Sequence, residues 1–190
     1  MNRLQRRAMK KRKVIKRTGL LKLDFGCGKR LREGFEGVDS IDFGQKYIVD
    51  LSKPWPWKDN SVEEANCQHM IEHLKPATRI HFVNELYRVL VPGGKCMLVA
   101  PHWASQRAYG DLTHEWPPVS EFWFYYLSSA WRKVNAPHND GYTCNFSVTW
   151  GYALHPEVQA RNAEYQQDML KWNKEAAMDV VATFEKVEAA

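Results

Sequence analysis

Three aspartates follow one another at the ends of strand-like segments in the first third of the chain. Asp24 lies near the end of Leu20–Phe25, and two further segments end near Asp39 and Asp50. A carboxylate at the end of a buried strand is unfavourable unless it is hydrogen-bonded, and the turn Gly26-Cys27-Gly28 that follows Asp24 lets another molecule approach the main chain. Because the carboxyl ends of parallel strands share one edge of a sheet, the pattern predicts a ligand site with three carboxylates and a glycine turn.

The residue types around this turn favour a nucleoside that carries an amino acid over one that carries phosphates. A dinucleotide site of the G-x-G-x-x-G type needs a third glycine, and Leu31 stands at that position. Asp24 would repel a phosphate but can hold an ammonium group, whereas Asp39 can accept hydrogen bonds from both ribose hydroxyls. These residues disfavour a nicotinamide cofactor and indicate S-adenosylmethionine (SAM).

The elements that must position this edge alternate between strand and helix. Strands are predicted at 20–25, 62–67 and 95–100, and two short strands are predicted to end near residues 39 and 50. A helix is predicted to begin at Pro76 and to end at the Pro-Gly-Gly of 92–94. The second half predicts a helix at 119–131, a strand at 145–154, a long polar helix at 156–177 and a last strand within 180–187. This order predicts an α/β fold with a doubly wound, mainly parallel sheet. Since only 14 residues separate Asp24 from Asp39, the first crossover helix must be very short or absent.

Charge divides the chain into a basic segment and a mildly acidic body. Residues 1–17 hold nine Lys or Arg and no acid, whereas the rest holds 18 basic and 22 acidic residues. We therefore expect a basic tail at 1–18 and one domain at 19–190, with a cofactor half at 19–102 and an acceptor half at 103–190. The basic residues 1–17 predict one of two roles for the tail: it binds nucleic acid by neutralising phosphates, or it is a solvated arm without a partner. The sequence leaves the oligomeric state open.

Composition argues against several classes of protein. No run of about 18 apolar residues predicts a transmembrane helix, so no membrane partner is expected. The basic start is not followed by the apolar stretch of a signal peptide, which argues against secretion. Four cysteines without any C-x-x-C are typical of reduced thiols in the cytoplasm rather than of disulfides or a zinc site. We therefore expect a cytoplasmic protein.

Four motifs in residues 20–102 resemble those of the class I SAM-dependent methyltransferases, specifically their small "GCG" branch. In order they are LDFGCGK, GVDS, VDLSKPWPWKDNSVEEANCQHMIEHL and ELYRVLVPGGKCMLVAPH. The carboxyl half, including DLTHEWPPVSEFWFYYL, is similar to small phage-encoded proteins of this superfamily. The resemblance implies a Rossmann-like methyltransferase fold, SAM as cofactor, and methyl transfer to an acceptor that is a small molecule or a nucleic acid.

Carried over by position, the same resemblance implies where the cofactor binds. The methionine end would lie at the glycine turn, the ribose at the second strand, the adenine after the third, and the methyl group beside the residue that follows the fourth. The implied cofactor-binding residues are Asp24, Phe25, Gly26, Cys27, Gly28, Asp39, Ser40, Asp50, Leu51 and His69. Glu72 and His73 are interpreted as structural residues that orient the start of the next helix.

The acceptor side offers few candidates for catalysis. Methyl transfer chiefly requires alignment of the acceptor with the methyl group and exclusion of water, and it needs a general base only when the acceptor is protonated. His114 is the first candidate for a base or orienting group, with packing on Trp116 as the alternative; His102 and Asp111 follow. Metal binding by these three residues with His138 lacks tight ligand spacing, so no metal is predicted. The alternative function is a SAM-binding module without transferase activity that binds a partner or nucleic acid.

Overall fold

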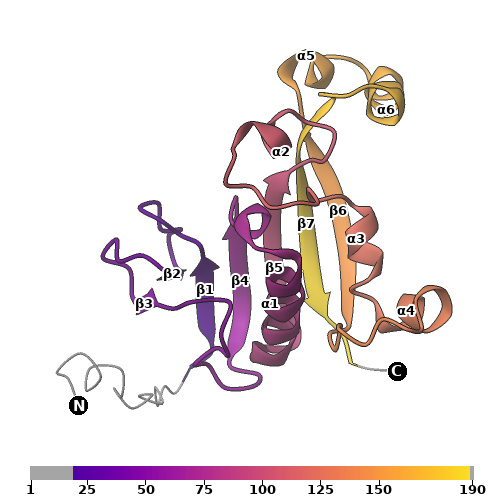
Figure 1. Cartoon of the computed structure of the whole chain (residues 1–190). Coiled ribbons are helices and arrows are strands. Elements are labelled where there is room, and N and C mark those ends of the chain that lie inside the picture. Colours follow the sequence, from indigo (N-terminus) through magenta and orange to yellow (C-terminus); the bar gives the residue numbers. More distant parts are fainter. Residues whose placement is uncertain (1–18, 189–190) are drawn as a thin grey trace.

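Seven strands form one sheet in the order β3-β2-β1-β4-β5-β7-β6 in the computed structural model, which describes residues 19–188 (Figure 1). Strands β1 to β5 are parallel, and β7 is antiparallel to both of its neighbours. The strand bounds are β1 Leu21–Phe25, β2 Glu36–Asp39, β3 Tyr47–Ile48, β4 Val62–Gln68, β5 Leu90–Pro101, β6 Phe146–Leu154 and β7 Ala177–Lys186. The predicted α/β, mainly parallel sheet is confirmed, and its order reverses between β1 and β4, where ligands bind in such sheets.

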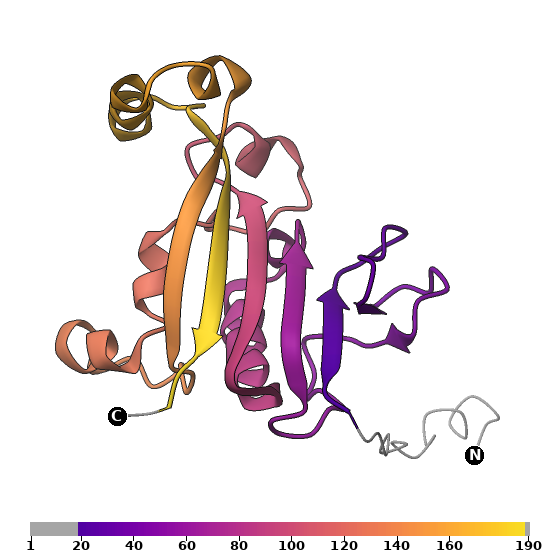
Figure 2. The ribbon, with the colours of Figure 1, turned by 180° about the vertical axis from the view of Figure 1, so that it is seen from behind.

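Helices cover one face of this sheet. The described residues form the 3₁₀ helix η1 Ile71–His73 and the α-helices α1 Pro76–Val89, α2 Arg107–Gly110, α3 Phe122–Tyr125, α4 Ser129–Asn135, α5 Pro156–Gln159 and α6 Ala163–Trp172. Of these, α5 and α6 lie beyond the ends of β6 and β7 and not over a face (Figure 1). Seen from behind, α1, α3 and α4 lie beyond the strands, and no helix of residues 19–188 covers the near face (Figure 2). The segments from β1 to β2 and from β2 to β3 contain no helix, which confirms the predicted loss of the first crossover helix. Within residues 19–188 no helix has the length and apolar character needed to cross a membrane.

The two faces of the sheet differ in chemistry. The covered face carries the aromatic core, in which the Phe25 ring lies 4.7 Å from that of Trp55 between centroids. On the uncovered face the register partners Lys22, Glu64, Lys95 and Glu185 form one row across four strands. Lys22 Nζ lies 2.8 Å from Glu64 Oε2, and Lys95 Nζ lies 3.3 Å from Glu185 Oε2. Opposite charges on neighbouring strands stabilise their pairing and suit this face to water.

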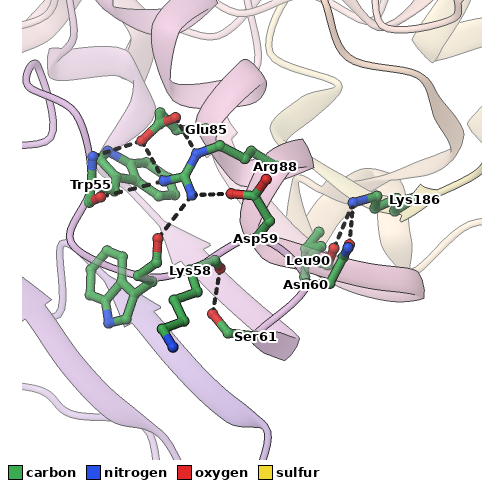
Figure 3. A network of polar contacts seen from close by, with 10 residues as sticks. Trp55, Lys58, Asp59, Asn60, Ser61, Glu85, Arg88, Leu90 and Lys186 are labelled. Carbon is green, nitrogen blue, oxygen red and sulfur yellow. Dashed lines mark hydrogen bonds and ion pairs between the residues drawn. The ribbon is translucent and has the colours of Figure 1, made fainter. Parts of the chain in front are cut away.

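Arg88 on α1 anchors the loop that leads from β3 to β4 (Figure 3). Its guanidinium donates hydrogen bonds to Glu85 Oε1 at 2.7 Å, Asp59 Oδ1 at 2.8 Å and the Trp57 carbonyl at 2.9 Å. Glu85 Oε2 in turn accepts from the Trp55 backbone N–H at 2.6 Å. Side chains of α1 therefore fix a long loop that has no helix of its own.

Three predicted elements in the chain are wrong in extent. The helix expected at 119–131 is divided into α3 and α4 at Ser128, whose backbone is extended and whose side chain caps α4. The polar helix expected at 156–177 is divided into α5 and α6 because Asn162 is extended and caps α6 in the same way. Strand β5 begins at Leu90, directly after α1, rather than at residue 95. The basic segment 1–17 lies outside the described residues.

Candidate functional site

Asp24 is buried at the carboxyl end of β1, where it faces a cavity, with 3% of its surface exposed. Its Oδ2 accepts a hydrogen bond from the Arg32 backbone N–H at 3.0 Å, and its Oδ1 accepts one from Asn66 Nδ2 at 2.5 Å. Asn66 is its register partner on β4. The carboxylate is thus held in place by neutral donors, and its remaining lone pairs can meet a ligand.

The glycine turn after Asp24 folds tightly against β2 and Met70. Gly26 and Gly28 have φ values of +68° and +51°, a region that favours glycine. The N–H groups of Gly26 and Cys27 both donate to the Val38 carbonyl, at 2.8 and 3.3 Å. A Cβ atom on Gly26 would lie 2.6 Å from Met70 Cβ. Only glycine fits at position 26 without displacing its neighbours.

Two cavities meet at Gly26, which lines both of them. The first has a volume of about 730 Å³, and its lining includes Asp24, Cys27, Gly28, Arg32, Asn66 and His69. The second has a volume of about 520 Å³, and its lining includes Asp39, Ser40, Asp50, Leu51, His73 and Glu115. A ligand that occupies both cavities would pass the bare main chain of Gly26 and meet carboxylates on either side.

Asp39 connects the glycine turn to the end of β2. Its Oδ2 accepts from the Gly28 N–H and its Oδ1 from the Ile41 N–H, both at 3.0 Å. Each carboxylate oxygen has a further lone pair for a ligand hydroxyl in the second cavity. The residue therefore both shapes the turn and offers two charged acceptors.

Asp50 and Leu51 form the far end of the second cavity. Asp50 Oδ1 accepts from the Ser52 N–H at 2.9 Å and from the Ser52 hydroxyl at 2.6 Å, and these hydrogen bonds lower the pKa of Asp50. Leu51 is buried, and its carbonyl accepts from Trp55 Nε1 at 3.3 Å. This end of the cavity combines an apolar side chain with an ionised carboxylate.

His69 follows β4 in a left-handed conformation, with φ +51°, which is uncommon outside glycine. Its Nδ1 lies 3.4 Å from Glu72 Oε1, and the hydrogen bond to Glu72 raises the pKa of His69. The side chain lines the first cavity. An imidazole therefore lies near the junction of the two cavities.

Nine of the ten residues predicted to bind the cofactor line these cavities, five in the first and a further four in the second. The exception is Phe25, which is fully buried in the aromatic core. Successive strand residues point to opposite faces, so that Asp24 and Phe25 cannot both face the ligand. Cys27 lines the first cavity, but burial raises the pKa of its thiol, which disfavours a nucleophilic role.

Two of the three predicted catalytic residues lie beside the second cavity. The His114 ring contacts that of His73 edge-on, with centroids 4.7 Å apart, rather than packing on Trp116. Its Nε2 lies 3.9 Å from Asp111 Oδ2. Hydrogen bonds from Thr113 lower the pKa of Asp111, which is therefore ionised at neutral pH. The pair lies next to His73, which is part of the cavity wall.

His102 lies apart from both cavities. It is buried after β5, where its Nε2 lies 3.3 Å from Glu121 Oε2 and its ring contacts that of Tyr152 edge-on. The hydrogen bond from His102 lowers the pKa of Glu121. These contacts join β5 to the segment before α3.

Arg79 on α1 organises this part of the site and was not singled out by its sequence pattern. Its buried guanidinium donates only to backbone carbonyls, and these belong to Ile71, Glu72, Leu74, Glu115 and Pro117. The contacts fix η1 against the segment 111–118. Asn66, the partner of Asp24, was also missed, although its position on the strand that pairs with β1 at the reversal of strand order is a usable signal.

An exposed aromatic groove is formed by residues of the segment 103–125. It has a volume of about 470 Å³, and its aromatic lining consists of Trp103, Tyr109, Trp116, Phe122 and Tyr125. Trp116 directly follows Glu115, which lines the second cavity, and is 73% exposed. Aromatic faces of this kind can stack on a flat ligand.

Comparison with known proteins agrees with this geometry. The family model described as "Methyltransferase domain" matches residues 23–98, the segment that runs from Leu23 in β1 to Leu98 in β5. No curated protein sequence matches the chain.

Solved structures similar to this one cover most of the chain at low identity. A SAM-dependent methyltransferase from Archaeoglobus fulgidus has a TM-score of 0.61 at 16% identity, over 89% of this chain and 87% of that one. A SAM-dependent methyltransferase from Methanosarcina mazei has a TM-score of 0.53 at 15% identity, over 92% and 95%. The 1,6-didemethyltoxoflavin N1-methyltransferase of Burkholderia thailandensis, solved with S-adenosylhomocysteine (SAH), has a TM-score of 0.54 at 12% identity, over 90% and 72%. Residues 23–98 thus match a methyltransferase domain, and the described chain has the Rossmann-like fold of SAM-dependent methyltransferases.

Proposed function

We propose that the protein is a SAM-dependent methyltransferase that binds its cofactor across the two cavities that meet at Gly26. The methionine end lies in the first cavity with its ammonium group near Asp24, and the ribose lies in the second with its hydroxyls at Asp39. The adenine lies between Asp50 and Leu51. The observation that carries this proposal is that carboxylates from three consecutive strand ends line two joined cavities around one glycine turn.

The chemistry of the site supports methyl transfer that depends on alignment of the acceptor with the methyl group of SAM. The acceptor lone pair attacks the methyl carbon of the sulfonium in line with the carbon–sulfur bond, so the protein must orient both molecules and exclude water. His69 lines the first cavity, where it can border the methyl group, and we assign His114 with Asp111, which lie beside His73, to orientation of the acceptor. The exposed aromatic groove suits an acceptor with a flat or apolar part, whether a small molecule or a nucleic-acid base.

Calorimetry on Asp39→Asn tests the cofactor site. We expect the variant to bind SAH about 10- to 100-fold more weakly, because a hydrogen bond to a charged acceptor contributes about 1.5–3 kcal/mol. Asn keeps one oxygen for the turn but loses the charge that the ribose hydroxyls meet. Asp42→Asn is the matched control, since Asp42 lies in the same loop and binds the Gly44 N–H without lining either cavity.

Two results would contradict the cofactor assignment. One is equal loss of SAH affinity in the two variants, and the other is tighter binding of NAD than of SAH by the unaltered protein. Transfer itself is tested with methyl-labelled SAM and a cell extract separated into RNA, DNA, protein and small molecules. Binding of SAH without label in any fraction would favour the SAM-binding module.

Deletion of residues 1–17 is expected to leave the affinity for SAH unchanged. Every residue that lines the two cavities lies at position 24 or later. Calorimetry with the shortened protein checks this. A clear loss of affinity would contradict the proposed division between a tail at 1–18 and a domain from 19 onward.

A further inference from the structure

Two histidines and a glutamate meet beside the second cavity, and we propose that Glu72, His73 and His114 bind a divalent transition-metal ion. One potential ligand atom of each residue lies within 4.8 Å of those of the other two. Two imidazole nitrogens and one carboxylate oxygen form a ligand set that suits Mn²⁺, Fe²⁺, Co²⁺ or Zn²⁺ and leaves coordination positions open. His73 and His114 are 41 positions apart, which is why their spacing in the sequence does not reveal the site.

Hydrogen bonds at Nδ1 prepare both histidines as ligands. Nδ1 of His114 lies 3.2 Å from the Ala108 carbonyl, which can only accept, so this nitrogen carries the proton. The Thr113 hydroxyl donates to Asp111 Oδ1 at 2.7 Å, so its oxygen accepts from His73 Nδ1 at 2.9 Å. A ring that is protonated at Nδ1 alone keeps a lone pair on Nε2, and Nε2 of His114 lies 3.9 Å from Asp111 Oδ2. Metal-binding histidines are oriented by such a second hydrogen bond.

The Glu72 carboxylate lacks one partner that a cation would supply. Its side chain is 5% exposed, and Oε2 is buried with no hydrogen-bond partner, while Oε1 lies 3.4 Å from His69 Nδ1. A buried carboxylate oxygen without a partner is unfavourable. Direct coordination of a metal ion by Oε2 would satisfy it and use the negative charge of the group.

The backbone around the three residues is already fixed. Arg79 Nη2 donates to the carbonyls of Glu72 and Glu115, at 3.1 and 2.8 Å, and the Glu115 N–H donates to the Glu72 carbonyl at 2.9 Å. The segment that carries Glu72 and His73 is therefore joined to the one that carries His114. Preorganised ligands lose little freedom when a metal binds.

The metal site suits an oxygen acceptor, an inference that rests on the proposed function and on the ability of such an ion to bind a hydroxyl group. His73 is part of the wall of the cofactor cavity, so an ion held by the three residues would lie beside the bound SAM. Coordination lowers the pKa of a hydroxyl, whose proton then leaves to water. The oxygen forms its bond to the methyl carbon as the carbon–sulfur bond breaks, and the electron pair of that bond stays on the sulfur of SAH. The acceptor class is therefore an alcohol or sugar hydroxyl.

Cobalt titration of the chelator-treated full chain tests the metal site. We expect one equivalent of Co²⁺ to bind with visible d–d absorption. His73→Ala, His114→Ala and Glu72→Gln should each weaken binding by at least about tenfold, since even outer-shell changes cost 10- to 100-fold. His138→Ala is the control, because His138 is exposed and lies outside the cluster. Circular dichroism on the same samples verifies that each variant folds.

The outcomes separate this proposal from the proposed function. No Co²⁺ binding at millimolar concentration, or equal binding in His138→Ala and His73→Ala, overturns the metal site, and SAH binding in chelator would leave the cofactor site standing. If Co²⁺ is bound by the three residues but SAH does not bind, the metal site stands and the proposed cofactor site is overturned. For the acceptor class, loss of transfer to hydroxyl compounds in chelator and its return with Mn²⁺ is the expected result, and equal transfer with and without chelator contradicts it.

Discussion

Replacement of Arg79 by methionine is expected to lower the free energy of unfolding by about 3 kcal/mol or more. The guanidinium donates to five backbone carbonyls from residues 71–74 and from the segment 111–118, and the residue is 6% exposed. Hydrogen bonds from a charged donor contribute about 1.5–3 kcal/mol each, and acceptors left buried without a partner cost about 1–3 kcal/mol, although such values do not add. Urea denaturation followed by circular dichroism measures the change.

Arg88→Met is the matched control for this prediction. Arg88 lies on the same helix and makes as dense a network, but its side chain is 30% exposed, so water can replace the lost contacts. We expect a loss of about 1 kcal/mol there. Arg79→Lys keeps the positive charge but lacks the planar guanidinium, so its loss in free energy of unfolding should lie between those of Arg79→Met and Arg88→Met. Equal losses for Arg79→Met and Arg88→Met would contradict the claim that burial at Arg79 makes the difference.

Much of the sheet could be predicted from the sequence because its signals are local. The apolar run before Asp24 and the short strand that ends at Asp39 become β1 and β2 within a residue of the expected positions. Pro76 starts α1, as a proline at the first helical turn does. The breaks at Ser128 and Asn162 were missed because no proline or glycine marks them. The caps at these breaks are single polar side chains, which also occur inside helices.

Residues of the site could be predicted from the sequence only where they lie at the end of a single strand. The cofactor-binding residues of β1, β2 and the loop after β3 could be predicted because each follows a recognisable strand segment. Phe25 was wrongly included because successive residues of β1 point to opposite faces of the sheet. The contact between His73 and His114 depends on a loop that returns to η1, and the role of Arg79 depends on five carbonyls that any residue type could offer. No spacing rule in the sequence encodes such contacts.

Gly26→Ala is expected to lower the free energy of unfolding by roughly 2–5 kcal/mol and to weaken SAH binding as well. A left-handed backbone at φ +68° costs a non-glycine residue about 1–2 kcal/mol. The new Cβ would also lie 2.6 Å from Met70 Cβ, and overpacking of this kind costs about 1–3 kcal/mol. Met70 lines the second cavity, so its displacement would narrow the space for the cofactor. Urea denaturation and SAH calorimetry measure the two effects.

Two further variants separate backbone strain from the clash with Met70. Gly28→Ala has the same strain, at φ +51°, but a Cβ there has no atom within 4 Å, so we expect it to cost only about 1–2 kcal/mol. In a Met70→Gly background, Gly26→Ala should cost no more than Gly28→Ala, because the Met70 Cβ and Cγ atoms that the new Cβ would meet are both removed. If Gly26→Ala is as mild as Gly28→Ala in the unaltered chain, Met70 does not press on the turn, and the glycine at position 26 is required for its backbone conformation alone.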